Sequence, residues 1–165
     1  MSFQEHLVED PSQSEAGRAL QDQLKVHCFG CGALNAHGLK IKSHWLGDEL
    51  VCRWRPQPFH IGHPGFVYGG AIACVIDCHA IWTALATACR QIDHALSSGP
   101  PPFAFVTGKL SVNYLKPMAI DAALDLHARV QAQTERKFVV SCRVMQHGVE
   151  CANAEVVAIR VKGGE

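Results

Sequence analysis

Apolar residues follow two different patterns along this chain, and each pattern predicts a different secondary-structure element. From Ala122 to Thr134, apolar and polar residues alternate, as they do in a strand with one buried face. From Gly69 to Arg90, apolar residues are nearly continuous and rich in alanine. That run is too long for an ordinary strand, so it predicts one long helix that is buried on most of its sides.

Other stretches of the chain predict further strands, separated by short turn signals. These strands are Leu39–Leu46, Glu49–Arg55, Phe103–Tyr114, Phe138–Gln146 and Glu150–Val161. The connections Gly47-Asp48, Glu135-Arg136 and His147-Gly148 have the length of hairpin turns. One long helix and about six strands in meander order predict an α+β fold, in which an antiparallel sheet wraps around one central helix.

The chain is predicted to form one domain with a short N-terminal appendage. Its 165 residues are enough to bury a sizeable core. Residues 1–26 are polar and form the predicted appendage, with a short helix expected over Ser14–Leu24. Residues 27–165 form the predicted domain.

The charge balance and the cysteine content limit which partners and which cellular location are expected for this chain. The chain has 15 basic and 15 acidic residues, so neither a nucleic-acid partner nor a membrane partner is expected. Its eight cysteines are scattered, several of them in apolar runs, and the first residues lack the pattern of a secretory signal. Reduced thiols and a cytoplasmic location are therefore expected. Asp77 and His79 within the long apolar run favour a core helix over a membrane span.

The predicted helix carries few polar side chains, and their spacing assigns them to two sides. At about 100° per residue, one stripe is made up of His79, Thr83, Thr87 and Arg90. His79 is expected to face solvent or another subunit. Asp77 projects to roughly the opposite side, among small and apolar residues. Such a carboxylate needs either a hydrogen-bonding partner or a chemical role, and these residues alone fit both interpretations.

The sequence Tyr68-Gly69-Gly70 starts the helix without a side-chain cap. The first amides of a helix usually donate to a Ser, Thr, Asp or Asn side chain, and none is present here. Glycines also let another group approach the backbone closely. Uncapped amides at a helix N-terminus form an anion site or an oxyanion hole, although a plain tight turn into a helix fits the same residues.

The segment around the helix start follows a pattern of a Pro-Gly loop, a Gly-Gly helix start and an acidic residue on the helix. In this chain these are Pro64-Gly65, Gly69-Gly70 and Asp77. The pattern resembles hotdog-fold thioesterases of the phenylacetate-pathway and thioesterase-superfamily type. The resemblance extends to Cys28–Leu39 and Val106–Pro117 and covers roughly residues 27–161. Tyr68 stands where that family usually has His.

The resemblance implies hydrolysis of a thioester of an acyl-coenzyme A or acyl-carrier substrate. Coenzyme A is then part of the substrate, and no separate cofactor is expected. In that arrangement the Gly69 amide, helped by Gly70, polarises the thioester carbonyl, and Asp77 acts as general base or as nucleophile. Thr107 matches a hydroxyl residue that positions the water. The alternative is a hotdog protein that binds acyl-coenzyme A without hydrolysing it, and Tyr68 is the residue that favours it.

Several further side chains are candidates for contact with the substrate. His60, His63 and Tyr68 lie in the loop before the helix, although neither histidine is expected to take part in the chemistry. The charged side chains suited to coenzyme A phosphates are Lys116, Arg136 and Lys137.

Cys28 and Cys31 form a Cys-x-x-Cys pair close to His27 and His37. No second pair follows at the spacing of a zinc ribbon, so no metal site is predicted. The pair is instead interpreted as part of a glycine-rich turn whose thiols pack inside. A zinc-dependent interaction module is the third interpretation of the chain.

The spacing of the helix residues also predicts an oligomer. Gly69 and Asp77 are eight residues apart, which is about 12 Å along a helix. A carbonyl in an oxyanion hole lies about 3 Å from its donor, and the attacking group about 3–3.5 Å from its carbon. Because one helix cannot supply both groups, we expect two antiparallel copies around a two-fold axis. The predicted assembly is a homodimer or a homotetramer built as a dimer of dimers.

Overall fold

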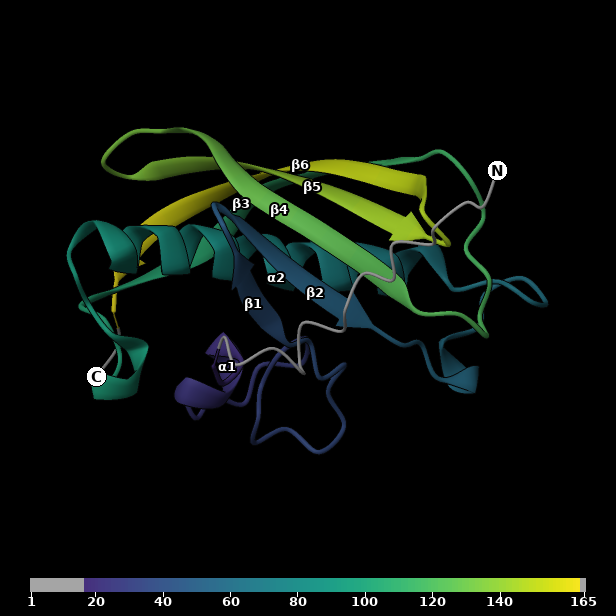
Figure 1. The fold of residues 1–165 in the computed structure, drawn as a ribbon, viewed down its shortest axis with the longest axis horizontal. Helices are drawn as coiled ribbons and strands as arrows, with labels where there is room; N and C mark the ends of the chain where they lie inside the picture. Colours follow the sequence, from purple (N-terminus) through teal and green to yellow (C-terminus); the bar gives the residue numbers. More distant parts are fainter. Residues whose placement is uncertain (1–16, 164–165) are drawn as a thin grey trace, which may run out of the picture.

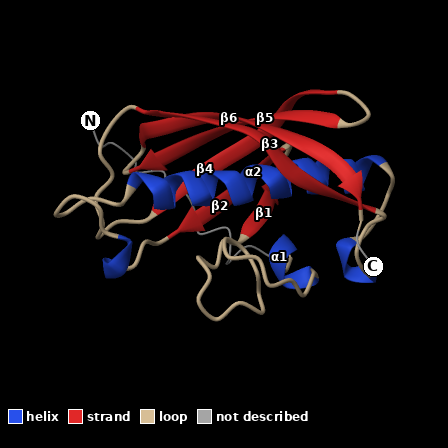
Figure 2. Cartoon of the chain, turned by 180° about the vertical axis from the view of Figure 1, so that it is seen from behind, coloured by secondary structure: helices blue, strands red, loops and turns tan. Residues whose placement is uncertain are grey.

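A curved sheet of six antiparallel strands wraps one side of a 23-residue helix (Figures 1 and 2). This computed structural model describes residues 17–163. The helices are α1 (Leu20–Gln23) and α2 (Gly69–Gln91), with 3-10 turns at Pro58–His60 and Leu96–Ser98. The strands are β1 (Ser43–Leu46), β2 (Glu49–Trp54), β3 (Phe103–Tyr114), β4 (Leu124–Gln133), β5 (Lys137–Gln146) and β6 (Val149–Lys162).

The predicted α+β fold is confirmed, and most elements begin and end within two residues of their predicted bounds. Among the strands the exception is β1, which begins at Ser43 and not at Leu39. Lys40 has a φ angle of 59°, and this left-handed conformation interrupts an extended strand. The predicted hairpin turns are present, and Gly47 and Gly148 adopt positive φ angles in them.

The predicted meander order is wrong for β3. The strands lie in the order β1-β2-β4-β5-β6-β3, so β3 occupies one edge of the sheet and pairs with β6. The chain leaves β2, crosses the concave face of the sheet through α2, and enters the sheet at its far edge (Figure 1). It then returns to β2 with β4, and β4, β5 and β6 follow as hairpin neighbours.

The core lies between α2 and the concave face of the sheet. Ile76, Ala80 and Ala84 on α2 are completely buried. The sheet side chains in the same hydrophobic cluster include Leu124, Leu126, Phe138, Val140, Val144 and Val156. By length and composition α2 is the one helix in the described part of the chain that is apolar enough to cross a membrane. Burial of α2 in this core also explains its apolar composition, because a helix that is apolar on most sides is normally buried against other parts of the protein.

His79 is completely buried, and the prediction that it faces solvent or another subunit is wrong. Its Nε2 lies 3.0 Å from the carbonyl oxygen of Leu50, and its Nδ1 lies 2.8 Å from Ser43 Oγ. Gln21 Nε2 donates to the same Ser43 hydroxyl at 2.8 Å. With Nε2–H donating to Leu50, Nδ1 accepts from Ser43, so both nitrogens of the neutral ring are satisfied. A polar side chain can therefore sit inside the core.

Part of the predicted appendage is attached to the domain through this network. Gln21 is completely buried, and Leu20 belongs to the hydrophobic core. The predicted helix over Ser14–Leu24 is present as the shorter α1, and the beginning of that predicted range lies outside the described residues.

The buried His79 makes stability depend on pH. Burial lowers the pKa of His79 to about 4 from an ordinary value of 6.5. The unfolded chain therefore binds a proton at a higher pH than the folded chain, and stability falls as pH drops from 6.5 towards 4. We expect wild type to lose about 2 kcal/mol between roughly pH 7 and pH 5 from this group. His79→Gln, which cannot titrate, should lose less over that range in urea unfolding. Parallel pH profiles for the two proteins would contradict this assignment.

Candidate functional site

Helix α2 begins with two amides that no side chain caps, as predicted. Tyr68 is the N-cap residue and forms no side-chain cap hydrogen bond. Its carbonyl accepts hydrogen bonds from the amides of Ala71 and Ile72, at 3.0 and 3.2 Å. The preceding amides of Gly69 and Gly70 find no acceptor among residues 17–163. These amides are the free donors that a helix start leaves, and they point toward any group that approaches the N-terminus.

The loop before α2 is held from two sides. The Tyr68 amide donates to the carbonyl of His60 at 2.8 Å, and the Val67 amide donates to that of Met118 at 2.9 Å. The His60 ring stacks on Trp54 with centroids 5.1 Å apart, and its Nδ1 accepts from the Gln57 amide at 2.9 Å. Burial lowers the pKa of His60. This histidine therefore supports the loop in a neutral form.

Tyr114 and Tyr68 pack against the two glycines of the helix start. The Tyr114 hydroxyl donates to the carbonyl oxygen of Gly69 at 2.6 Å. Burial raises the pKa of Tyr114, with smaller contributions from Cys74 and Tyr68. A Cβ on Gly70 would lie 2.3 Å from the Tyr68 ring, so a larger residue there would displace that ring. The glycines thus permit two aromatic rings to approach the helix start.

A cavity of about 420 Å³ opens beside Gly69. It is lined by His63, Phe66, Val67, Gly69, Ile72, Tyr114, Leu115, Lys116, Pro117 and Met118. Most of these side chains are apolar, and two of the predicted substrate-binding residues, His63 and Lys116, are among them. The cavity can therefore receive an apolar group next to the free amides, with a basic side chain close by.

The other predicted phosphate-binding residues lie elsewhere. Arg136 is in the β4–β5 turn and Lys137 is the first residue of β5. This turn is at the left of Figure 1, whereas the loop before α2 is at the right. Gln133, just before this turn, accepts a hydrogen bond from Gln91 at the last residue of α2. Within one chain, these two basic side chains are therefore at the opposite end of the helix from Gly69.

Asp77 and Thr107 are in direct contact. The Thr107 hydroxyl donates to Asp77 Oδ1 at 2.5 Å. Asp77 is half-buried on α2, and Thr107 is exposed on β3. The carboxylate thus has one fixed hydrogen-bond donor and remains open on its other side. Two turns of α2 separate it from Gly69, about 12 Å along the helix axis, so one chain carries the two groups as separate candidate half-sites.

A β-bulge allows β3 to contact both half-sites. The pairing of β3 with β6 shifts between Thr107 and Lys109, so Gly108 is an extra residue in β3. Thr107 and Tyr114 are seven residues apart and would point to opposite faces of a regular strand. The bulge reverses the alternation, and both side chains face α2. Tyr114 was not among the predicted site residues, although a glycine inside a strand is a signal for such a bulge.

Strand β3 also exposes apolar side chains at the edge of the sheet. Val106 is 50% exposed and Leu110 is 36% exposed, and both lie near Thr107 in the strand. An edge strand has unpaired backbone groups on one side. The combination of a free edge with apolar side chains is typical of a surface that pairs with another chain.

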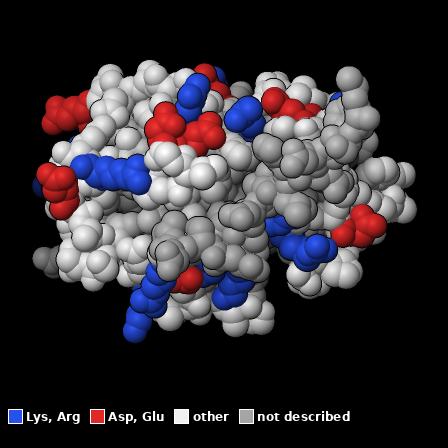
Figure 3. Space-filling model, in the orientation of Figure 1, with Lys and Arg blue, Asp and Glu red and all other residues white. Residues whose placement is uncertain are grey.

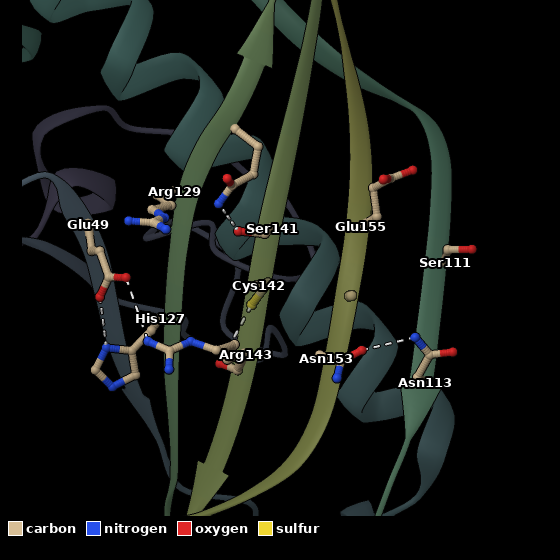
Figure 4. A pocket seen from close by; sticks show the side chains of 12 residues that line it. Glu49, Ser111, Asn113, His127, Arg129, Ser141, Cys142, Arg143, Asn153 and Glu155 are labelled. Atoms are coloured by element: carbon tan, nitrogen blue, oxygen red, sulfur yellow. Dashed lines mark hydrogen bonds and ion pairs between the residues drawn. The ribbon is translucent and has the colours of Figure 1, made fainter.

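A larger hollow of about 760 Å³ lies on the outer face of the sheet, away from α2 (Figure 4). Glu49 forms an ion pair with Arg143 at 3.6 Å, and its other carboxylate oxygen lies 3.4 Å from His127 Nδ1. Asn113 donates to Asn153 at 2.9 Å across the same hollow. None of the predicted site residues lines it. On the molecular face in Figure 3, basic and acidic side chains are interspersed.

The loop before β1 brings a pair of cysteines to α2. The sulfur atoms of Cys28, Cys31 and Cys78 all lie within 4.8 Å of one another. A hydrogen bond from Cys78, together with one from the Trp82 indole, lowers the pKa of Cys31 to about 6. Burial opposes this shift. The same contact with Cys31 raises the pKa of Cys78. Three thiols in one cluster are a candidate set of metal ligands.

The fold and the helix start define the class of protein. An antiparallel sheet wrapped around a central helix, with a Gly-Gly start and an acidic residue two turns later, is a hotdog-fold architecture. The family described as Thioesterase superfamily matches residues 64–152, which include the loop, α2, β3, β4 and β5. The chain belongs to this family.

Similar proteins agree with this assignment. A thioesterase-superfamily protein from Shewanella loihica PV-4 has 35% sequence identity and a TM-score of 0.60, covering 77% of this chain and 96% of that one. A putative thioesterase from Ralstonia eutropha JMP134, described as related to phenylacetic acid degradation, has 19% identity and a TM-score of 0.58 over 73% and 85% of the two chains. At 19% identity, the similarity to the Ralstonia protein shows a shared fold alone.

A curated relative is also similar over most of this chain. Acyl-coenzyme A thioesterase THEM4 of Rattus norvegicus is 28% identical over 162 residues, which are 97% of this chain and 62% of that protein. The chain spans about half of the length of the curated relatives that it matches.

The contact between Tyr114 and Gly69 can be tested by removing one oxygen. Tyr114→Phe loses the hydrogen bond to the Gly69 carbonyl and should lower the free energy of unfolding by about 1 kcal/mol. Tyr68→Phe is the matched control, because the Tyr68 hydroxyl has no hydrogen-bond partner within residues 17–163. Urea unfolding measures both variants. Equal stability of the two would show that the hydroxyl contributes nothing at the helix start.

Proposed function

We propose that this chain hydrolyses thioesters of acyl-coenzyme A or of an acyl carrier. The observation that carries the proposal is the pair of free amides at Gly69 and Gly70 beside an apolar cavity of about 420 Å³. A thioester carbonyl next to these amides would receive hydrogen bonds that strengthen as negative charge develops on its oxygen. The acyl chain would occupy the apolar part of the cavity.

Asp77 would supply the group that activates water or attacks the thioester carbonyl. Thr107 holds one oxygen of this carboxylate at 2.5 Å, which leaves the other oxygen free to act. As a general base, Asp77 accepts the proton of a water whose oxygen bonds to the thioester carbon. The carbon–sulfur bond then breaks, and the thiolate leaves with the proton as free coenzyme A. As a nucleophile, Asp77 would instead bond to that carbon and displace the thiolate, which leaves an anhydride between Asp77 and the acyl group. Water would hydrolyse this anhydride in a second step, releasing the acid and supplying the proton for the thiol of coenzyme A.

The two half-sites would meet across a two-fold axis. The half-site at Gly69 and the half-site at Asp77 are about 12 Å apart on one helix. The exposed edge of β3, with Val106 and Leu110, provides a surface through which a second copy can pair. With two antiparallel copies of α2, Gly69 of one chain would lie near Asp77 of the partner subunit. A homodimer would then be the smallest active unit, and a dimer of dimers would contain the same sites twice.

The basic and apolar residues around the cavity favour an acyl-coenzyme A substrate. Lys116 lines the cavity together with apolar side chains such as Leu115 and Met118. Lys116 would pair with a coenzyme A phosphate, whereas the apolar lining would exclude water from the acyl group. The rat relative carries the name acyl-coenzyme A thioesterase, which supports the same class of substrate.

Tyr68 favours one alternative, a hotdog protein that binds acyl-coenzyme A without hydrolysing it. The ring is 59% exposed and lies against Gly70 at the helix start. It would limit the access of a carbonyl to the second amide. A panel of acyl-coenzyme A substrates with a thiol-detecting dye distinguishes the two functions, because hydrolysis releases a free thiol and binding does not.

Asp77→Asn tests the proposed chemistry. The amide can accept the same hydrogen bond from Thr107, but it can neither take a proton nor attack a carbonyl. We expect turnover in the dye assay to fall by at least about a hundredfold, while thermal unfolding stays close to that of wild type. The control is Asp125→Asn, a half-buried carboxylate on β4 that pairs with Arg53. Full activity in Asp77→Asn would refute the proposed role.

Mixed dimers test whether two chains share a site. Gly69→Pro removes the proposed oxyanion amide at a helix position that tolerates proline, and it breaks no hydrogen bond of that amide within the described chain. Asp77→Asn removes the proposed general base or nucleophile. Each variant alone should be nearly inactive. When the two are unfolded and refolded together, about half of the dimers are mixed and about a quarter of the wild-type sites should return.

The control for this experiment is the composition of the refolded sample. Native mass spectrometry must show mixed dimers, and circular dichroism must show that Gly69→Pro folds alone. If mixed dimers form and no activity returns, Gly69 and Asp77 of the same chain serve one site, and the shared-site proposal fails.

A further inference from the structure

The contacts at Cys28, Cys31 and Cys78 place three sulfur atoms where one metal ion can bind them. Cys28 and Cys31 come from the loop before β1, and Cys78 comes from α2. The Cys28 and Cys78 sulfur atoms are 3.5 Å apart, and all three lie within 4.8 Å of one another. The sequence offered two thiols at short spacing, which are too few for a closed zinc site. The fold adds a third that lies 47 residues beyond Cys31 in the chain.

The spacing of these sulfur atoms fits a metal better than a disulfide. Zinc binds thiolate sulfur at about 2.3 Å, so two sulfur ligands of a tetrahedral ion are about 3.8 Å apart. The Cys28–Cys78 separation of 3.5 Å is close to that value. A disulfide would need the two sulfur atoms to approach to about 2 Å. A metal ion can therefore bind with small adjustments of the side chains.

The surroundings of the cluster favour thiolates as ligands. The buried Trp82 indole N–H donates to Cys31 Sγ at 3.0 Å, and such a donor stabilises sulfur that carries negative charge. The Lys42 ammonium is near enough to act on Cys31 electrostatically, and it also pairs with Asp22. Its positive charge would offset the excess negative charge of three thiolates on a divalent ion.

The backbone around the cluster is shaped to bring the loop against the helix. A Cβ on Gly30 would lie 2.4 Å from Cys78 Sγ, so only glycine lets the loop pass this close. The Gly32 amide donates to the Cys28 carbonyl at 2.8 Å and closes the turn between the two cysteines. The Leu39 amide donates to the Phe29 carbonyl at 2.8 Å and holds the loop at its other end. The loop is thus fixed around the sulfur atoms.

We propose that Cys28, Cys31 and Cys78 form a binding site for a zinc ion, with a fourth position open to solvent beside the exposed Cys28 thiol. Thiolate ligands select a thiophilic ion such as zinc over magnesium or calcium. The bound ion would connect the loop before β1 to α2 at the residue that follows Asp77. None of its ligands lines the Gly69 cavity, so zinc binding can be tested separately from the proposed hydrolysis.

Zinc binding to the purified, reduced chain tests the proposal. The protein is stripped with a chelator and titrated with Zn²⁺ against a chromophoric competitor, and Co²⁺ then serves as a spectroscopic probe of thiolate ligation. We expect about one Zn²⁺ per wild-type chain, thiolate-to-cobalt charge-transfer absorption, and a melting temperature that rises with zinc. Cys28→Ser and Cys78→Ser should each weaken zinc affinity at least about tenfold.

Cys74→Ser is the matched control, because Cys74 is exposed on α2 one helical turn before Cys78 and lies outside the cluster. It should bind zinc as wild type does. Cys28→Ser replaces an exposed thiol and keeps the test valid if Cys78→Ser fails to fold. The proposal is overturned if reduced wild type binds no stoichiometric zinc, or if Cys28→Ser retains wild-type affinity. A Cys28–Cys78 disulfide in a protein that binds no zinc after reduction would also overturn it.

Discussion

Helix α2 is apolar on most of its sides, and the rest of the structure depends on how those sides are covered. The concave face of the sheet covers one side, where Ile76 and Ala80 are completely buried. The loop before β1 covers another, where Cys31 contacts Trp82. Burying this much apolar surface is the main driving force available to a domain of this size. The side that carries Asp77, next to the edge strand β3, is the one that the chain leaves partly open.

This partial cover explains why the candidate chemistry lies where it does. A carboxylate that was fully enclosed would have to be neutral or paired with a cation. Asp77 is half-buried and receives one neutral hydrogen bond from Thr107, so it keeps access to solvent on one side. The amides at Gly69 are accessible for a similar reason, because a helix start in a glycine sequence has no side chain to cover it. The fold therefore buries the middle of the helix and leaves both candidate site residues at its surface.

The sequence predicted features that depend on near neighbours and missed those that depend on distant contacts. The bounds of α2 and of β4 and β5 follow from the period of their apolar residues, which the fold leaves unchanged. The edge position of β3 depends on pairing with β6, which lies far along the chain, so the meander prediction was wrong. A preference for sequential neighbours is a statistical tendency, and a helix that crosses a sheet overrides it.

His79 and the candidate site illustrate the same limit. Because His79 shares a helical stripe with Thr83 and Arg90, it was predicted to face solvent or another subunit. Its hydrogen-bonding partners Ser43 and Leu50 come from β1 and β2, and their proximity depends on how the sheet packs against α2. The pattern around Gly69 and Asp77 selected residues of both half-sites because it is a local spacing on one helix. Tyr114 was missed because its direction depends on a bulge six residues earlier in β3, at Gly108.

The bulge at Gly108 determines which side chains of the second half of β3 face α2. The extra residue turns Leu110, Val112 and Tyr114 toward α2 and turns Ser111 and Asn113 toward the outer face. If Gly108 paired with Val157, as in a regular strand of the same length, these two sets would be exchanged, placing an amide and a hydroxyl inside and an aromatic ring outside. Deletion of Gly108 would instead remove the bulge and leave Leu110, Val112 and Tyr114 facing α2. In sequence alignments of the family, a one-residue gap at Gly108 is therefore compatible with the same helix start, whereas a one-residue gap between Lys109 and Tyr114 would turn Tyr114 away from Gly69.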